Sequence, residues 1–361
     1  MKPTGIVTLH QSTNFGAFLQ AFALQEFLRQ QGLDPVFVDI DYRLALHKRV
    51  RRRIGQLVGR KWFAQQQAAI LASSVASHFD TSGRASDRYA QLFVGSDEMW
   101  TVRNPSFRSR KQFFGVGLQA ERLSAYAPSM GQTRFEDLAG QPALVQGLQA
   151  FDDLSARDAA TVDAVHRLTG REVAHVLDPT FLIDWQAHIK PIQVKDALLV
   201  YSYAVDSPAL ASLREYATSQ GLRLVATGMS HDWADELVPA TPFEFLGLLQ
   251  SARAVVTDTF HGTIFAALMG ANFAVLGHNP RNKLKALIDE LGLHTRVWNA
   301  QRSLSHALNG PFELRRQADP CASRERASMA YLRHCLVGDV VPARTSRAGY
   351  KAGSSYADVE A

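Results

Sequence analysis

The residues best suited to chemistry lie in the run TDTFHG at positions 257–262. An apolar run before them predicts a buried strand, and the residues after them predict a helix ending near Met269. His261 therefore stands where a strand ends and a helix begins. Ligands of parallel α/β sheets lie outside the carboxyl ends of strands, and the free N–H groups of a helix N-terminus attract anions. We expect His261 to meet a phosphate or carboxylate and to move a proton; a histidine that only packs or caps the turn is the alternative.

Arg157, in the run LSARD, is a second candidate. The run predicts the start of a helix with Arg157 in its first turn, where the helix dipole disfavours a cation, and this suggests a specific anionic partner. A guanidinium binds two oxygen atoms at once, so Arg157 is the best clamp for a carboxylate or phosphate in this half of the chain. A salt bridge to Asp153 or Asp158 is the alternative.

A third candidate is the polar turn His10–Gly16, which follows the first predicted strand. Its last residues, Asn14-Phe15-Gly16, open a predicted helix. The turn lacks the pattern G-x-G-x-x-G, so we do not expect a dinucleotide there. Either a phosphate or a second substrate lies at Asn14, or these residues form only a tight turn.

Strands and helices alternate in the order that builds parallel sheets. The polar stretch 184–196 predicts a linker between an N-terminal α/β domain, residues 1–184, and a C-terminal Rossmann-like domain, residues 197–317. Residues 318–340 predict a helix that crosses back over the first domain, and the Gly-, Ser- and Arg-rich residues 341–361 predict disorder. The predicted strands lie in 5–9, 35–40, 89–100, 123–131, 173–180, 197–203, 222–226, 273–276 and 296–298, and the further predicted helices in 17–31, 208–220, 242–252, 282–291 and 324–336.

The most basic part of the chain is residues 43–61, where Arg, Lys and His alternate with Leu, Ile and Val, and Trp62-Phe63 follows. A basic amphipathic helix with an aromatic edge favours an anionic membrane surface, so these residues predict peripheral membrane contact through 43–63. Binding to a pyrophosphate group and a merely solvated helical face are the alternatives.

The composition excludes several classes of protein. The formal charge of +5, from 39 basic and 34 acidic residues, is a mild preference for anionic partners and does not indicate nucleic-acid binding. The two cysteines form neither a disulfide framework nor a metal pattern and the histidines are scattered, so we expect no metal site and a cytoplasmic setting. No apolar run is long enough to span a bilayer, which predicts a soluble or peripherally attached protein.

Six runs occur in the order seen in the polysaccharide pyruvyl transferase family, which this sequence resembles from about residue 5 to residue 277. They are NFGAFLQAFALQ, FVGSDEMW, SAYAPSMG, LSARD, VLDPTFL and VVTDTFHGTIFAALMG. VGSD-x-x-W together with TD-x-FHG is the most specific pair. The resemblance implies a two-domain α/β fold similar to GT-B glycosyltransferases, with two Rossmann-like parallel-sheet domains facing a cleft. It also implies transfer of a pyruvyl group from phosphoenolpyruvate to a sugar as a ketal.

The resemblance matches the histidine of the family to His261 and its early-helix arginine to Arg157. Many members carry Arg two residues before the histidine, where this sequence has Thr259. A second cation for the donor must then come from elsewhere in the chain. Its candidates are Arg103, Arg108 and Arg281.

The implied ketal chemistry needs an acid for the methylene carbon of the donor, a base for the sugar hydroxyl and cations for the donor's carboxylate and phosphate. His261 suits the acid because the ordinary pKa of histidine lies near neutrality. Either Asp258 or Asp97 is the predicted base; Asp97 otherwise binds acceptor hydroxyls, and Asp258 otherwise caps its turn. No cofactor is expected. The remaining predicted substrate-binding residues are Asn14, Ser96, Thr259 and Gly262.

The resemblance thus implies a cytoplasmic transferase that acts on a cell-surface polysaccharide or its lipid-linked precursor, at the inner face of the membrane where residues 43–63 bind it. A GT-B-type glycosyltransferase that uses a nucleotide sugar in exopolysaccharide biosynthesis is the alternative, because a fold does not fix a function. A sugar-binding or scaffold protein of the same pathway is the non-enzymatic alternative.

Overall fold

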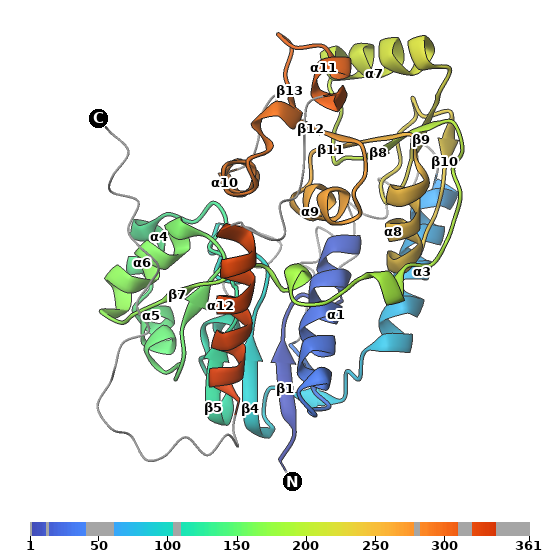
Figure 1. Cartoon of the computed structure of the whole chain (residues 1–361). Coiled ribbons are helices and arrows are strands. Elements are labelled where there is room, and N and C mark those ends of the chain that lie inside the picture. The colour runs from blue at the N-terminus through green and yellow to red at the C-terminus, as the bar shows by residue number, and fades with distance from the viewer. Residues whose placement is uncertain are drawn as a thin grey trace, which may run out of the picture.

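Two parallel sheets, one in each half of the chain, form the framework of the computed structural model (Figure 1). The structure describes residues 2–11, 14–40, 61–103, 110–277, 282–309 and 320–336. The central strands are buried along their whole length, as apolar strands are when helices cover both faces of a parallel sheet. The predicted α/β fold class with two parallel sheets is confirmed.

The N-terminal sheet has the strand order β3-β2-β1-β4-β5, with every pair parallel. A small parallel pair, β6 and β7, extends this half. The strands are β1 (Thr4–Val7), β2 (Val36–Asp39), β3 (Gly83–Arg84), β4 (Arg88–Val94), β5 (Gln119–Ala125), β6 (Ser155–Ala156) and β7 (Ala174–His175). The helices are α1 (Phe15–Gln30), α3 (Lys61–His78), α4 (Phe135–Ala139), α5 (Pro142–Gln149) and α6 (Ala159–Thr169).

The C-terminal sheet has the strand order β10-β9-β8-β11-β12-β13, again with every pair parallel. Its strands are β8 (Ala197–Tyr201), β9 (Arg223–Ala226), β10 (Glu236–Leu237), β11 (Ala254–Thr257), β12 (Phe273–Leu276) and β13 (Val297–Trp298). Its helices are α7 (Ser207–Gln220), α8 (Pro242–Ser251), α9 (Phe260–Leu268), α10 (Asn282–Leu291) and α11 (Leu304–Asn309). Four 3₁₀ helices cover Lys111–Phe114, Pro179–Phe181, Gln186–His188 and Leu293–Arg296.

Each sheet reverses its strand order next to its first strand, between β1 and β4 in one sheet and between β8 and β11 in the other. Such reversals open a crevice at the carboxyl ends of the strands, because the connections on either side leave in opposite directions. Helix α1 follows β1 and helix α9 follows β11, so the N-termini of both helices lie at these crevices.

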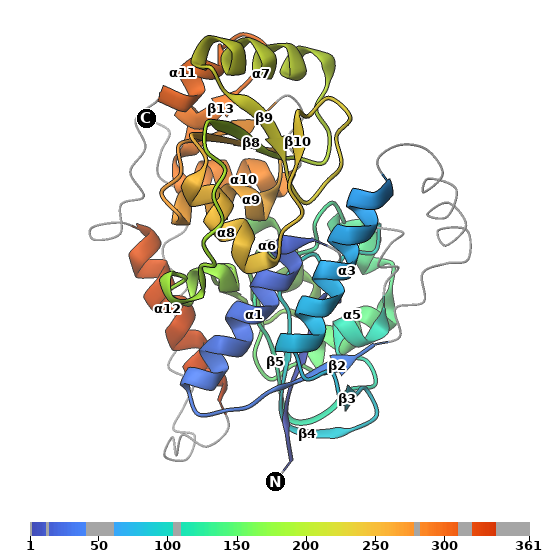
Figure 2. The same ribbon diagram turned by 90° about the vertical axis from the view of Figure 1, so that its right-hand side faces the viewer.

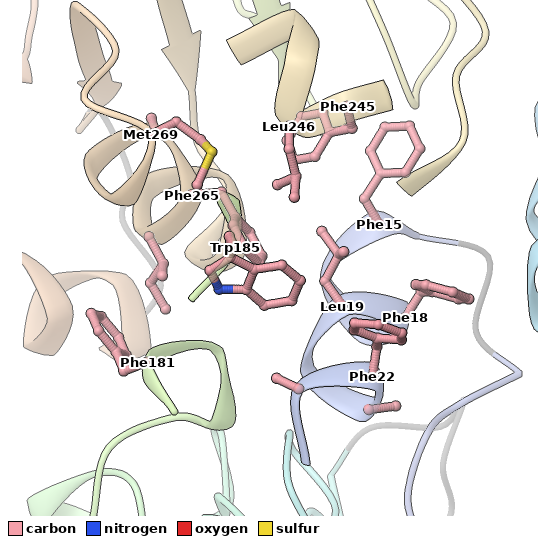
Figure 3. Packing of buried hydrophobic residues seen from close by; sticks show 14 of the residues in the cluster. Phe15, Phe18, Leu19, Phe22, Phe181, Trp185, Phe245, Leu246, Phe265 and Met269 are labelled. Carbon is pink, nitrogen blue, oxygen red and sulfur yellow. The ribbon is translucent and has the colours of Figure 1, made fainter. Parts of the chain in front are cut away.

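The two halves share one apolar core, which α1 fills from the N-terminal side (Figure 3). Phe15 stacks on Phe245 of α8 with ring centroids 4.6 Å apart, and Phe22 packs edge-on against Phe243 at 4.9 Å. Trp185 packs against Phe265 of α9 at 5.0 Å. Aromatic pairs of this kind fix the two halves against each other.

Helix α12 (Pro320–Cys335) returns from the C-terminal half and lies along the N-terminal half (Figures 1 and 2). The Tyr331 hydroxyl donates to the carbonyl oxygen of Ala125 at 2.9 Å, and Arg324 forms an ion pair with Glu290 of α10. The helix thus contacts both halves. It begins four residues before the predicted Arg324, because Pro320 suits the first turn of a helix.

One local prediction is wrong. Arg157 is not in the first turn of a helix: it precedes Asp158, whose side chain caps α6 by accepting from the N–H of Thr161 at 2.9 Å. The stretch 184–196, the predicted linker, contains a 3₁₀ helix, and Trp185 is buried in the shared core.

Other predictions fall on residues outside those described. The basic residues 43–60 and the tail 341–361 are among them. The domain boundaries at 184, 197 and 317 stay predictions. None of the described helices combines the length and apolarity needed to cross a membrane.

Candidate active site

His261 lies in the first turn of α9, held there by the cap of the helix. The Thr259 side chain accepts a hydrogen bond from the N–H of Gly262 at 2.9 Å, and its oxygen lies 3.0 Å from the Thr257 hydroxyl. A Cβ on Gly262 would lie 2.3 Å from the Thr259 oxygen, so only glycine fits this turn. Thr259 and Gly262 therefore hold the backbone that carries His261.

Two groups from distant parts of the chain meet at one carboxylate oxygen of Asp178, and a third, Asp97, joins them through Arg157. Arg157 Nη1 donates to Asp178 Oδ2 at 2.8 Å, and Arg157 Nη2 donates to Asp97 Oδ1 at 3.0 Å. His261 Nε2 lies 3.5 Å from the same Asp178 oxygen, an ion-pair distance when the ring is protonated. The predicted candidates Arg157, Asp97 and His261 are thus brought together.

The environment keeps Asp178 ionised although it is buried. Burial alone raises a carboxyl pKa, but His261 and Arg157 hold the pKa of Asp178 well below its usual range. The backbone N–H and hydroxyl of Thr180 also donate to Asp178 Oδ1, at 3.1 and 2.9 Å. Burial lowers the pKa of Arg157, yet Asp97 and Asp178 together raise it above its ordinary value. Both charges therefore persist across the physiological pH range.

The Arg157 guanidinium is more buried than that of an arginine that is free to bind a ligand. Its side chain is 2% exposed, and both terminal nitrogens donate to carboxylates. The guanidinium also lies 4.4 Å from the ring centre of Phe260, which packs beneath it. The alternative salt bridges are absent among the described residues, because Asp153 pairs with Arg122 and Asp158 caps α6.

His261 also meets the N-terminus of α1 from the other half of the chain. A Cβ added to Gly16 would lie 2.3 Å from His261 Nδ1 and 2.4 Å from its Cγ, so the imidazole packs directly on the backbone there. Asn14 caps α1 by accepting from the N–H of Ala17 at 2.7 Å. The motif NFG thus fits its helix against the histidine, which gives the small-residue turn a physical reason.

Ser96 and Asp258 lie in different surroundings from the Asp178 cluster. The Ser96 hydroxyl donates to Gln20 Oε1 at 2.6 Å within a fully buried network. Asp258 accepts from the backbone N–H of Tyr203 at 2.8 Å and of Ala204 at 3.4 Å, so it fixes the loop after β8. Its assignment as the base stays a prediction, and its contacts are those of a capping residue.

Arg103 is the candidate second cation that the described residues include, and it does not lie at the Asp178 cluster. Arg103 forms a two-pronged ion pair with Asp137, at 2.5 and 2.9 Å. Arg108 and Arg281 lie outside the described residues, in the segments 104–109 and 278–281.

A small pocket lies where the Asp178 cluster meets α10. Its walls combine apolar side chains with one arginine and three carboxyl groups. Burial raises the pKa of one of them, Glu290, although its partner Arg324 opposes the shift. The residues around the pocket are Arg157, Asp158, Leu177, Asp178, Phe181, Phe260, Ala286, Leu287 and Glu290.

Sequence reasoning missed Asp178 as a candidate. A signal for Asp178 is present in the sequence. Asp178 lies in the segment VLDPT at the end of a predicted strand, and polar residues at strand ends gather at the crevice. Its partners lie far away in sequence, and spacing alone does not reveal such a contact. Within the described residues there is no cluster of three or more His, Cys, Asp or Glu side chains able to hold a metal ion.

Comparison with known proteins supplies the context for this cluster. The sequence model of the polysaccharide pyruvyl transferase family matches residues 14–280, which include Arg157, Asp178 and His261. The chain belongs to the polysaccharide pyruvyl transferase family. No curated protein matches the sequence.

Of three solved structures of low identity that resemble this pyruvyl transferase family member, the first has a TM-score above 0.5 and shares its fold. UDP-GlcNAc 2-epimerase from Methanocaldococcus jannaschii, solved with UDP-GlcNAc and UDP, is 11% identical, with 92% of this chain and 100% of that chain covered and a TM-score of 0.51. A putative UDP-N-acetylglucosamine 2-epimerase from Listeria monocytogenes is 11% identical, with 92% of each chain covered and a TM-score of 0.48. The calicheamicin glycosyltransferase CalG4 is 13% identical, with 93% and 95% covered and a TM-score of 0.39. The fold of the chain is GT-B-like.

Proposed function

We propose that this family member transfers a pyruvyl group from phosphoenolpyruvate to a sugar of a cell-surface polysaccharide or its precursor, forming a pyruvate ketal. The family match supports the transferase class and the polysaccharide acceptor. The observation that carries the proposal is the contact of His261 with the ionised Asp178 at 3.5 Å. A carboxylate beside an imidazole orients the ring, and a positioned histidine is a common general acid, which the first step needs.

In the proposed reaction the imidazole of His261 gives a proton to the methylene carbon of phosphoenolpyruvate, which becomes a methyl group. The adjacent carbon gains positive charge, and the oxygen of a sugar hydroxyl bonds to it while a base takes the hydroxyl proton. The bond from that carbon to the phosphate oxygen then breaks, and a second hydroxyl closes the ketal. Of the two hydroxyl protons, one restores the acid and the other leaves with the phosphate, so the products are the ketal and hydrogen phosphate.

Asp97 is the better placed of the two predicted bases. It is 14% exposed and joined to Asp178 through Arg157, whereas both oxygens of Asp258 accept backbone N–H groups. We assign Arg157 the task of orienting Asp97 and Asp178, because both of its terminal nitrogens already bind them. Arg108 and Arg281 then remain the proposed donor cations.

The test is acceptor-dependent release of phosphate from phosphoenolpyruvate by the purified chain, compared between the parent and His261→Ala. Positioned acid–base catalysis contributes about 10²–10⁴ in rate, so the variant should lose that factor. Because His261 is buried against Asp178, the variant should melt at a lower temperature than the parent, and the assay is run below that temperature as the folding control. Turnover of His261→Ala at the parental rate would contradict the assignment. Sugar transfer from a nucleotide sugar, with no release of phosphate from phosphoenolpyruvate, would instead establish the glycosyltransferase alternative.

The acceptor carrier and the contact of residues 43–63 with an anionic membrane belong to the same proposal. A lipid-linked oligosaccharide would bring the sugar to the cytoplasmic face of the membrane, where a basic segment is attracted to anionic lipid. No cofactor is part of the proposed reaction.

A further inference from the structure

Two large hydrophobic side chains are exposed in the described part of the chain, Trp62 at 55% and Tyr203 at 48%. Scattered exposed rings need no explanation, but rings that gather on one surface indicate a binding site. Trp62 begins α3 in the N-terminal half, and Tyr203 follows β8 in the C-terminal half. The contacts between these two segments decide whether they share a surface.

A run of packed rings connects α3 to the loop after β9. The Trp62 ring packs edge-on against Phe63 at 6.0 Å, and Phe63 is buried in a cluster against which Trp233 packs. The imidazole of His231 stacks on Trp233, with ring centres 4.7 Å apart and planes 24° apart.

The same run continues to the loop after β8. His231 Nε2 lies 2.9 Å from the carbonyl oxygen of Ser202, the residue before Tyr203. We call the four rings of Trp62, Trp233, His231 and Tyr203 the aromatic surface. It extends from the end of β8 to the start of α3.

Hydrogen bonds fix the segments that carry the aromatic surface. Gln67 of α3 donates to the carbonyl oxygen of Ala240 at 2.8 Å and accepts from its N–H at 3.0 Å, so α3 is fixed beside β10 (Figure 2). Asp258 binds the backbone of Tyr203 three residues before His261. Preformed rings lose little entropy when a ligand binds them.

We propose that the aromatic surface binds the sugar chain of the acceptor, an inference that rests on the proposed function. Sugar rings pack their C–H faces on the flat faces of aromatic rings while their hydroxyl groups stay with water or carboxylates. The loops 202–206 and 228–235 carry three of the four rings and contain no Lys or Arg, but they contain Asp206, Asp232 and Asp235, whereas the fourth ring, Trp62, follows the basic residues 43–61. The acidic side chains disfavour a nucleotide diphosphate at these loops, so we take a neutral oligosaccharide as the ligand there.

The probes are Trp62 and the partly exposed Trp233, because Trp100, Trp185 and Trp298 are buried. The purified chain is screened on an array of neutral oligosaccharides without phosphoenolpyruvate. The glycan that binds best is then titrated while quenching of tryptophan fluorescence by acrylamide is measured. Bound glycan should shield both rings, and Trp62→Phe should lose part of the shielded signal while it keeps binding.

Matched substitutions separate the rings from the fold. Trp62→Ala and Tyr203→Ala should each weaken glycan binding by about tenfold, equivalent to about 1.4 kcal/mol. Trp62→Phe and Tyr203→Phe keep a ring and should bind within a small factor of the parent. Because both side chains are exposed, all four variants should keep the parental melting temperature.

Three results would overturn the inference: no glycan on the array binds the parent, the alanine variants bind as tightly as the parent, or UDP shields Trp62 where glycans do not. Glycan binding that depends on the rings, without any phosphate release from phosphoenolpyruvate, would refute the proposed transfer and leave the aromatic surface established. If the alanine variants release phosphate with an unchanged KM for the glycan, the aromatic surface is refuted and the proposed transfer is supported.

Discussion

Asp178 links the two candidate residues that come from different halves of the chain. Its Oδ2 accepts from Arg157 and faces His261, while Thr180 holds its other oxygen. A buried charge that loses one partner is costly, because nothing replaces the lost solvation. Asp178 therefore contributes both to the stability of the fold and to the orientation of His261.

Asp178→Asn should lower the free energy of unfolding by about 3 kcal/mol and reduce turnover, because the neutral amide loses the ion pair with Arg157 and no longer orients His261. Asp153→Asn is the matched control, since Asp153 is the partner of Arg122 in a part-buried ion pair. The control should lose stability but keep its turnover in the phosphate-release assay. Equal turnover in both variants, measured below their melting temperatures, would remove Asp178 from the mechanism.

At the scale of elements, the strand–turn–helix–strand unit around His261 is the part that sequence predicts best. Its apolar runs are long and its turn is polar, so β11, α9 and β12 lie where the pattern places them. Helix α10 matches its predicted bounds for the same reason.

Other elements leave too weak a signal in the sequence. The strand β6 is two residues long, so no alternation is visible, and Arg157 reads as part of the following helix. Asp158 caps α6 and marks its start, but the pattern LSARD does not show which of its residues is the cap. The cluster around Asp178 and the aromatic surface depend on contacts between segments far apart in the chain, and local patterns carry no such information.

Gly16 is the residue through which α1 meets α9. Gly16→Ala should reduce turnover by about tenfold or more and destabilise the fold by about 1–3 kcal/mol, because the added methyl group would overlap the His261 ring. Gly140→Ala is the control, since the nearest atom to its new methyl group is the Glu136 carbonyl oxygen at 3.5 Å. The kinetic comparison is made with saturating donor. An alanine variant at position 16 with parental turnover would mean that the contact does not position the histidine.

At the scale of the whole molecule, the two sheets are joined by a shared apolar core and by α12. The shared cluster includes residues from α1, α8, α9 and α12, and each half also has a buried apolar cluster of its own. Because the shared cluster is large and apolar, we expect the two halves to unfold together. The pocket at the Asp178 cluster lies where these two halves meet.

Leu332→Ala should lower the free energy of unfolding by about 2–5 kcal/mol, because Leu332 is fully buried on the inner face of α12. Arg333→Ala, on the exposed face of the same helix, should change it by less than about 0.5 kcal/mol. Calorimetry should show one unfolding transition in the parent and both variants. Two separated transitions in the parent would show that the halves are independent.

The central claim is that His261 delivers a proton to the methylene carbon of phosphoenolpyruvate. The direct measurement is to run the reaction in D₂O and analyse the pyruvate ketal of the product glycan by mass spectrometry and NMR. Delivery from an acid that exchanges with solvent predicts one deuterium in each ketal methyl group, with the product depleted in His261→Ala. A ketal methyl group without deuterium, or a glycan that gains no pyruvyl group at all, would contradict the account.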